Sequence, residues 1–159
     1  MTDLDATAKK ANVKDSLKKY FVDNLETTEG LNLTFDKYLS TPKVQGHEVD
    51  RWVGLRFGST EMSVMGHQML DIYNCTRSDA EGFKLAQQRD KIFKYLTDSS
   101  QTDGMARIPF YRSRADGNWT LLAGGFVVQK PVIESDEIDA DDGTKFQILT
   151  VTLRFSSKV

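Results

Sequence analysis

The stretch from residue 69 to residue 96, MLDIYNCTRSDAEGFKLAQQRDKIFKYL, changes its hydrophobic period halfway. Its first part alternates, so that Leu70, Ile72 and Asn74 share one face, as in a β-strand. Its second part carries apolar residues at helical spacing, after an S-x-x-E capping box that begins at Ser78. A strand that leads through a short turn into a packing helix restricts the chain to folds that layer helices on a sheet.

The rest of the chain supplies one more amphipathic helix and several alternating segments. Val13, Leu17 and Phe21 follow helical spacing, with lysines on the other face and Asn12 as the expected cap. Pro109 confines its strand to a sheet edge or a strand start, because proline donates no ladder hydrogen bond. The expected strands span residues 31–35, 51–57, 62–75, 106–114, 118–129 and 145–155, with turns at 58–60 and at Asp116-Gly117 and loops at 40–50 and 134–144.

These elements predict an α+β fold, a mostly antiparallel β-sheet flanked by two α-helices at about 13–24 and 79–96. Residues 1–11 are mixed in charge and rich in small side chains, which predicts a flexible N-terminal arm. Residues 12–159 then form one domain, since no internal repeat or linker interrupts them.

Composition excludes several classes of protein. The net charge of -2 and the pI of about 5.7 give no basic field that would recruit nucleic acid or an anionic membrane. No apolar run reaches the length of a membrane span, and no secretory signal opens the chain. The single cysteine, Cys75, cannot form an intramolecular disulfide, so a reducing cytoplasm is the default setting.

The sequence offers no recognisable catalytic group. His47 and His67 belong to no metal-binding pair, and each is interpreted as structural. Cys75 and His67 lie on one predicted strand and would stand roughly 26 Å apart, so they cannot act as a nucleophile and base. Cys75 is interpreted as a small buried hydrophobe. We therefore expect no enzyme activity, catalytic residue, cofactor or metal.

An acidic loop precedes the last strand. Calcium loops of the EF-hand type need acids at the first, third and fifth places before a glycine, and the alignment on Gly143 fails this test. The loop is interpreted as a solvated hairpin, or as a surface that keeps passing DNA from sticking through charge repulsion. Its acids are Glu134, Asp136, Glu137, Asp139, Asp141 and Asp142.

Two basic features remain. One hairpin interleaves arginines with aromatic residues, as single-strand binders do, although an interaction surface or plain sheet is the preferred interpretation. These residues are Arg107, Phe110, Tyr111, Arg112, Arg114 and Trp119. Arg89 lies on the apolar stripe of the second helix, where we expect its stem to pack and its head to reach solvent. The alternative is a charge held for a neighbouring subunit.

The order of elements resembles the tail-terminator (tail completion) proteins of long-tailed bacteriophages. The stretches that carry the resemblance are VKDSLKKYFVDNL, RWVGLRFGS, the 69–96 stretch, LLAGGFVVQKPVIES and FQILTVTLRF. They cover nearly the whole chain, but they form a pattern of elements and contain no invariant motif.

The resemblance implies a viral structural protein that forms a hexameric ring on the head-proximal end of the tail tube. Such a ring ends tube polymerisation and presents a docking surface to the head-side connector, so its partners are its own copies, the tube protein and the connector. DNA would pass through without sequence-specific binding, and no membrane is involved. The place implied is the neck region of the virion, after assembly in the host cytoplasm.

Within this resemblance, two hypotheses concern single features. The acidic loop faces the lumen or a partner, and Arg89, Arg107, Arg112 and Arg114 are candidates for intersubunit charge pairing. Two other functions stay open. The nearer is another neck or tail component, a head–tail connector or a tube subunit, and the farther is a small enzyme or ligand-binding domain.

Overall fold

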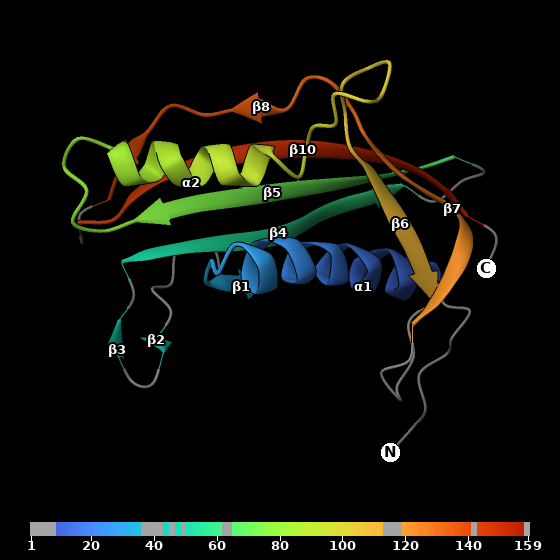
Figure 1. The fold of residues 1–159 in the computed structure, drawn as a ribbon, viewed down its shortest axis with the longest axis horizontal. Coiled ribbons are helices and arrows are strands. Elements are labelled where there is room, and N and C mark those ends of the chain that lie inside the picture. The colour runs from blue at the N-terminus through green and yellow to red at the C-terminus, as the bar shows by residue number, and fades with distance from the viewer. Residues whose placement is uncertain are drawn as a thin grey trace.

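The computed structural model has one curled β-sheet with both α-helices packed on the same face (Figure 1). It describes residues 9–35, 43–44, 47–48, 50–61, 65–112, 119–140 and 143–157. The elements in chain order are α1 (Lys9–Phe21), the π-helix η1 (Val22–Thr28), β1 (Leu33–Phe35), β2 (Lys43–Val44), β3 (His47–Glu48), β4 (Arg51–Glu61), β5 (Gly66–Thr76), α2 (Phe83–Phe93), β6 (Arg107–Arg112), β7 (Thr120–Val128), β8 (Ile133–Glu134), β9 (Ile138–Asp139) and β10 (Lys145–Ser157). The predicted α+β class is confirmed.

The sheet is ordered β1-β4-β5-β10-β7-β6, with β8 and β9 also paired to β10. All its pairs are antiparallel except β1 with β4, which is parallel. The long strand β10 changes partners along its length: Leu153–Ser157 pair with β7, whereas β8 and β9 pair with its first half. The edges of the sheet are therefore β1 beside β4, β6 beside β7, and β8–β9 beside the first half of β10.

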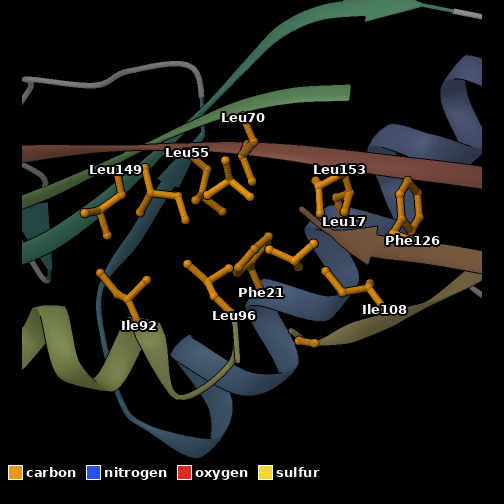
Figure 2. Close-up of a cluster of buried hydrophobic side chains, with 14 of the residues drawn as sticks. Leu17, Phe21, Leu55, Leu70, Ile92, Leu96, Ile108, Phe126, Leu149 and Leu153 are labelled. Carbon is orange, nitrogen blue, oxygen red and sulfur yellow. The ribbon is translucent and has the colours of Figure 1, made fainter. Parts of the chain in front are cut away.

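The main core lies between the sheet and the two helices (Figure 2). Leu55 stands opposite Ile72, which stands opposite Leu149, so one row of fully buried side chains crosses three strands. Leu17 of α1 and Ile92 of α2 pack against the same cluster. Full burial of each such side chain stabilises the fold by about 1.5–3 kcal/mol, so this face fixes the register of the sheet.

The opposite face of the sheet is not covered by either helix. Its central row, Arg56, Asp71 and Thr150, is polar, and the Thr150 hydroxyl donates to Asp71 Oδ1 at 3.1 Å. At one end of this face Trp52 and Cys75 join a small second cluster, and both are fully buried. Burial raises the pKa of the Cys75 thiol to about 12, so it stays protonated and is structural, as expected.

The first helix differs from the prediction at both ends. It begins at Lys9 rather than Val13, so residues 9–11 are helical and Asn12 is a buried helical residue, not a cap. Lysine and alanine favour the helix, which lets it extend toward the N-terminus. Beyond Phe21 the chain continues as η1, whose wider turn keeps Leu25 fully buried.

The second helix begins later than predicted, at Phe83, and the expected capping box of Ser78 and Glu81 is wrong. Asp79 caps the helix instead: its carboxylate accepts from the amide of Lys84 at 3.1 Å and from that of Leu85 at 2.9 Å. Its Oδ2 also accepts from the hydroxyl of Thr76 at 3.1 Å. Because one turn of chain separates Asp79 from the first helical residue, the helix begins four residues after its capping side chain.

Three strand predictions also need correction. Residues 58–60 do not turn the chain but lie inside β4, whose register shifts between Phe57 and Thr60. The acidic stretch is not simply a loop, because β8 and β9 pair with β10. The expected loop at 40–50 contains the short β2–β3 ladder.

Other strand predictions are confirmed. Leu149, Val151 and Leu153 point into the core, and Pro109 lies on the edge strand β6. The predicted turn at Asp116-Gly117 and residues 1–8 of the predicted arm lie outside the described residues. In the described part of the chain, no helix combines the length and the apolar character of a membrane span.

Candidate docking surfaces

The acidic segment lies along α2 and the edge of β10. Glu134 forms an ion pair with Arg89 of α2, with Arg89 Nε 3.1 Å from Glu134 Oε1. The side-chain amide of Gln147 donates to Glu134 Oε2 at 3.4 Å. The hydrogen bond to Glu134 raises the pKa of Arg89, so the guanidinium stays charged. The segment is thereby fastened to the helix.

At the other end of the segment, Lys145 Nζ lies 2.9 Å from Asp139 Oδ1, and this bond raises the pKa of Lys145. Between the two ion pairs, Glu137 lies against Gly82: a Cβ on Gly82 would come within 2.9 Å of both carboxylate oxygens. Gly82 has φ +73, a left-handed backbone conformation that residues with a side chain adopt only with strain. Glycine thus lets the acidic segment approach the start of α2.

The remaining acids are divided. Asp136 and Glu137 are exposed, and among the described side chains neither forms an ion pair. Asp141 and Asp142 lie outside the described residues. Within the described ranges, no group of three metal-ligating side chains comes together. The four described acids form a strip along one edge of the sheet.

Arg89 is half-buried, and its guanidinium head contacts other residues of the same chain. Its guanidinium carbon lies 3.7 Å from the centre of the Phe93 ring, a cation–π contact. Its charge is directed to Glu134 and also to Asp90, with Arg89 Nη1 3.0 Å from Asp90 Oδ1. Arg89 therefore has in-chain partners in the single subunit.

The basic and aromatic residues of the β6–β7 hairpin do not form one surface. Phe110 is fully buried and stacks on Phe126, with ring centres 5.1 Å apart, so it cannot stack on a base. Arg107 pairs with Asp103 at 3.2 Å. Arg112 is half-buried and Arg114 lies outside the described residues.

Beside α1, Tyr111 and Trp119 meet edge to face, with ring centres 6.1 Å apart. Lys19 of α1 lies over both rings, 5.4 Å from the centre of Tyr111 and 5.7 Å from that of Trp119. The lysine that completes this cluster comes from a distant part of the chain, and the hairpin sequence gives no sign of it.

A second cluster that sequence reasoning missed lies on the other side of α1. Lys14 lies 5.2 Å from the centre of the Phe57 ring, and Lys18 lies 5.0 Å from that of Phe35. Lys10 lines the same shallow hollow as Lys14 and Phe57. The spacing of Lys10, Lys14 and Lys18 places them on one helical face, but only the fold shows the rings beside them.

A hollow of about 730 Å³ opens near the start of α2. Several of its polar side chains already have partners: Asp79 caps the helix, Lys145 pairs with Asp139, and Arg77 Nε donates to Thr144 Oγ1 at 3.4 Å. The described lining residues are Arg77, Ser78, Asp79, Ala80, Asp139, Gly143 and Lys145. They provide ion pairs and a cap rather than an aligned nucleophile and base.

The candidate pair of His67 and Cys75 does not come together in the fold. His67 and Cys75 both lie on β5, as predicted, at opposite ends of the strand. His67 Nδ1 lies 3.8 Å from Glu61 Oε2 on the neighbouring strand. His47 belongs to β3, and its side chain lies outside the described ones.

Comparison with known proteins shows the fold alone. No protein-family model and no curated protein matches the sequence. Seven chains of solved structures match in fold. One of them, whose name states no function, superposes with a TM-score of 0.56 at 9% sequence identity, over 94% of this chain and 96% of that chain. The same architecture therefore extends along almost the full length of both chains.

Proposed function

We propose that this chain is a structural virion protein, the subunit of a ring that caps the head-proximal end of a phage tail tube. The ring ends tube polymerisation and provides the docking surface for the head-side connector. The observation that supports this most is the element order: α1, then β4, then β5 leading into α2, then the β6–β7 hairpin and β10. It is the order on which the resemblance to tail terminators rests.

The open face of the sheet fits such a role. Met69, Asp71 and Thr150 on β5 and β10 are half-exposed and combine apolar with polar contact area. The hydroxyl of Thr152 donates to the sulfur of Met69 at 3.3 Å, so even this uncovered row is ordered by side-chain contacts. An ordered surface of mixed polarity suits a docking face between subunits or with a tube.

The charge of the chain suits a ring around a passing genome. The net charge is -2. Negative side chains near a DNA path repel phosphates, so the DNA would slide through without sequence-specific binding. The place of action is then the neck of the virion, reached after assembly in the host cytoplasm.

Negative-stain electron microscopy of the purified protein, alone and mixed with tail tubes, tests the proposal. We expect discrete rings that bind one end of each tube and stop its growth. A monomer that ignores tubes would contradict the proposal and favour the small enzyme or ligand-binding alternative.

The same images separate the nearer alternatives. A tube subunit would form long open polymers, because a head-to-tail contact that does not close produces filaments. A head–tail connector would bind the head rather than the bare tube end. Rings at one tube end would exclude both.

A further inference from the structure

One side of α1 presents a row of three lysines. Lys10, Lys14 and Lys18 are four residues apart, so they lie on one helical face with a rise of about 6 Å between neighbours. Lys10 is exposed, and among the described side chains neither Lys10 nor Lys18 forms an ion pair. The rings of Phe35 and Phe57 border this row. We call these five residues the lysine face.

The acidic strip has the matching composition. Arg89 and Lys145 already pair with the acids at its two ends. The exposed carboxylates of Asp136 and Glu137 therefore leave an excess of negative charge in its middle. The flanking Ile133 is 61% exposed, which gives the strip an apolar contact beside its charges. The strip runs beside β10 from Leu149 to Lys145, four residue steps of about 3.3 Å, so its length is comparable to that of the lysine row.

The two features lie on opposite sides of the β4–β5–β10 ladder. The aromatic rings of the lysine face belong to β1 and β4, at one edge of the sheet, and the acidic strip is β8 and β9, on the far side of β5 and β10. Figure 1 shows α1 and β8 on opposite sides of the long strands. The features can meet only between two copies, in a contact that joins different faces and can repeat from copy to copy.

We propose that the lysine face binds the acidic strip of a neighbouring copy of this chain. The lysines pair with Asp136 and Glu137, and the flanking isoleucine packs against the rings. A second copy is favoured over nucleic acid because the complementary charge is present on the same chain, whose net charge is negative. The inference rests on the proposed ring, and it takes the acidic loop as partner-facing rather than lumen-facing.

Charge reversal tests this contact. One variant carries Lys14→Glu and Lys18→Glu, and the other Asp136→Lys and Glu137→Lys. We expect each variant alone to lose self-association by about tenfold or more, because like charges would then face each other. Light scattering after size-exclusion chromatography measures the assembly, and circular dichroism checks the fold.

Mixing the two reversed variants gives the decisive readout. The first variant is negative at both the lysine face and the acidic strip, and the second is positive at both. Each variant can therefore bind only the other variant, and a 1:1 mixture should form rings in which the two alternate. The matched control, Lys91→Glu with Lys94→Glu, changes the charge equally, but at the end of α2 beside Glu29 and outside both surfaces. It should assemble like the wild type. Higher salt should weaken the wild-type assembly, since the paired groups are exposed.

Each outcome decides the proposal. Rings that survive both reversals would overturn it and would return the acidic strip to the lumen, while tube capping could still hold. Failure of the mixture to assemble, loss of rings in the control, or a monomeric wild type would also overturn it. So would binding of short DNA duplexes that depends on Lys14 and Lys18 while rings stay intact. Rings that obey the charge rules but ignore tail tubes would support this contact and refute the capping function.

Discussion

At the scale of single residues, Asp79 decides where α2 begins. The S-x-x-E pattern favours Ser78 as the cap, but the backbone of Ser78 has φ +53, a left-handed conformation. The chain turns there, and the next carboxylate reaches the amides of Lys84 and Leu85. A short acidic side chain accepts two bonds from the free amides that every helix start leaves.

Replacing Asp79 should therefore lower the free energy of unfolding more than replacing Ser78, the cap that the sequence favours. Asp79→Ala should lower the free energy of unfolding by about 0.5–2 kcal/mol, because it removes a helix cap. Ser78→Ala, the matched control, should change it little, since both residues are equally strained at that φ. Urea denaturation of the two variants measures the difference; equal losses would show that the cap is assigned wrongly.

The same residue gives a pH dependence with a definite sign. Desolvation by itself would raise the pKa of Asp79, but the hydrogen bonds from Leu85, Lys84 and Thr76 together hold it below its ordinary value. A lowered folded pKa means that the contribution is full at neutral pH and is lost as pH falls through that pKa. The stability gap between the wild type and Asp79→Ala should therefore narrow in acid.

At the scale of elements, α1 protects the edge of the sheet that β6 forms. Ser16 of α1 is fully buried, and its hydroxyl accepts from the amide of Tyr111 at 2.8 Å and donates to the carbonyl of Tyr111 at 3.1 Å. One helical side chain thus pairs with the backbone groups of an edge strand. Edges left open invite pairing with other chains, so this contact also limits unwanted association.

Ser16→Ala tests how much this contact between α1 and β6 contributes to stability. The change leaves the amide of Tyr111 without its partner at a buried position, which should cost about 1–3 kcal/mol of folding stability. The exposed Ser156→Ala on β10 is the matched control and should be near neutral. Thermal and urea unfolding measure both; a neutral Ser16→Ala would mean that water replaces the bond without cost.

At the scale of the whole molecule, the β5–β10 pair forms the centre. Its ladder runs without a break from Lys145 opposite Thr76 to Phe155 opposite Gly66. Gly66 is needed at that end because a Cβ there would lie 2.4 Å from the Phe155 ring. The apolar faces of both helices pack on these strands, whereas β8 and β9 are short and lie at an edge.

Hydrogen exchange should reflect this arrangement. The amides of β5 and β10 that bond to each other should exchange only on global unfolding, about tenfold or more slowly than those of β8 and β9, which open locally. Exchange of the monomeric subunit, followed by NMR, measures the order. Equal protection of β8 and of β5 in the monomer would contradict it. Added protection of β8–β9 on assembly would agree with the contact proposed for the acidic strip.

The sequence by itself determined the class of the fold and the inward faces of its long elements. The alternation of Leu149, Val151 and Leu153 and the helical spacing of Leu17 and Phe21 are local periodic patterns, and burial follows such patterns directly. The edge position of Pro109 and the buried role of Cys75 were also predictable, because each depends on the chemistry of one residue.

Only the tertiary structure decided the helix boundaries, the pairing of β8 and β9, and the charged surfaces. The lysine row could be read from its spacing, but its rings come from β1 and β4. Likewise, the partner of Arg89 is Glu134, which lies far along the chain. Local pattern reports which face of an element is apolar; it carries no information on which distant residues the fold brings beside the polar face.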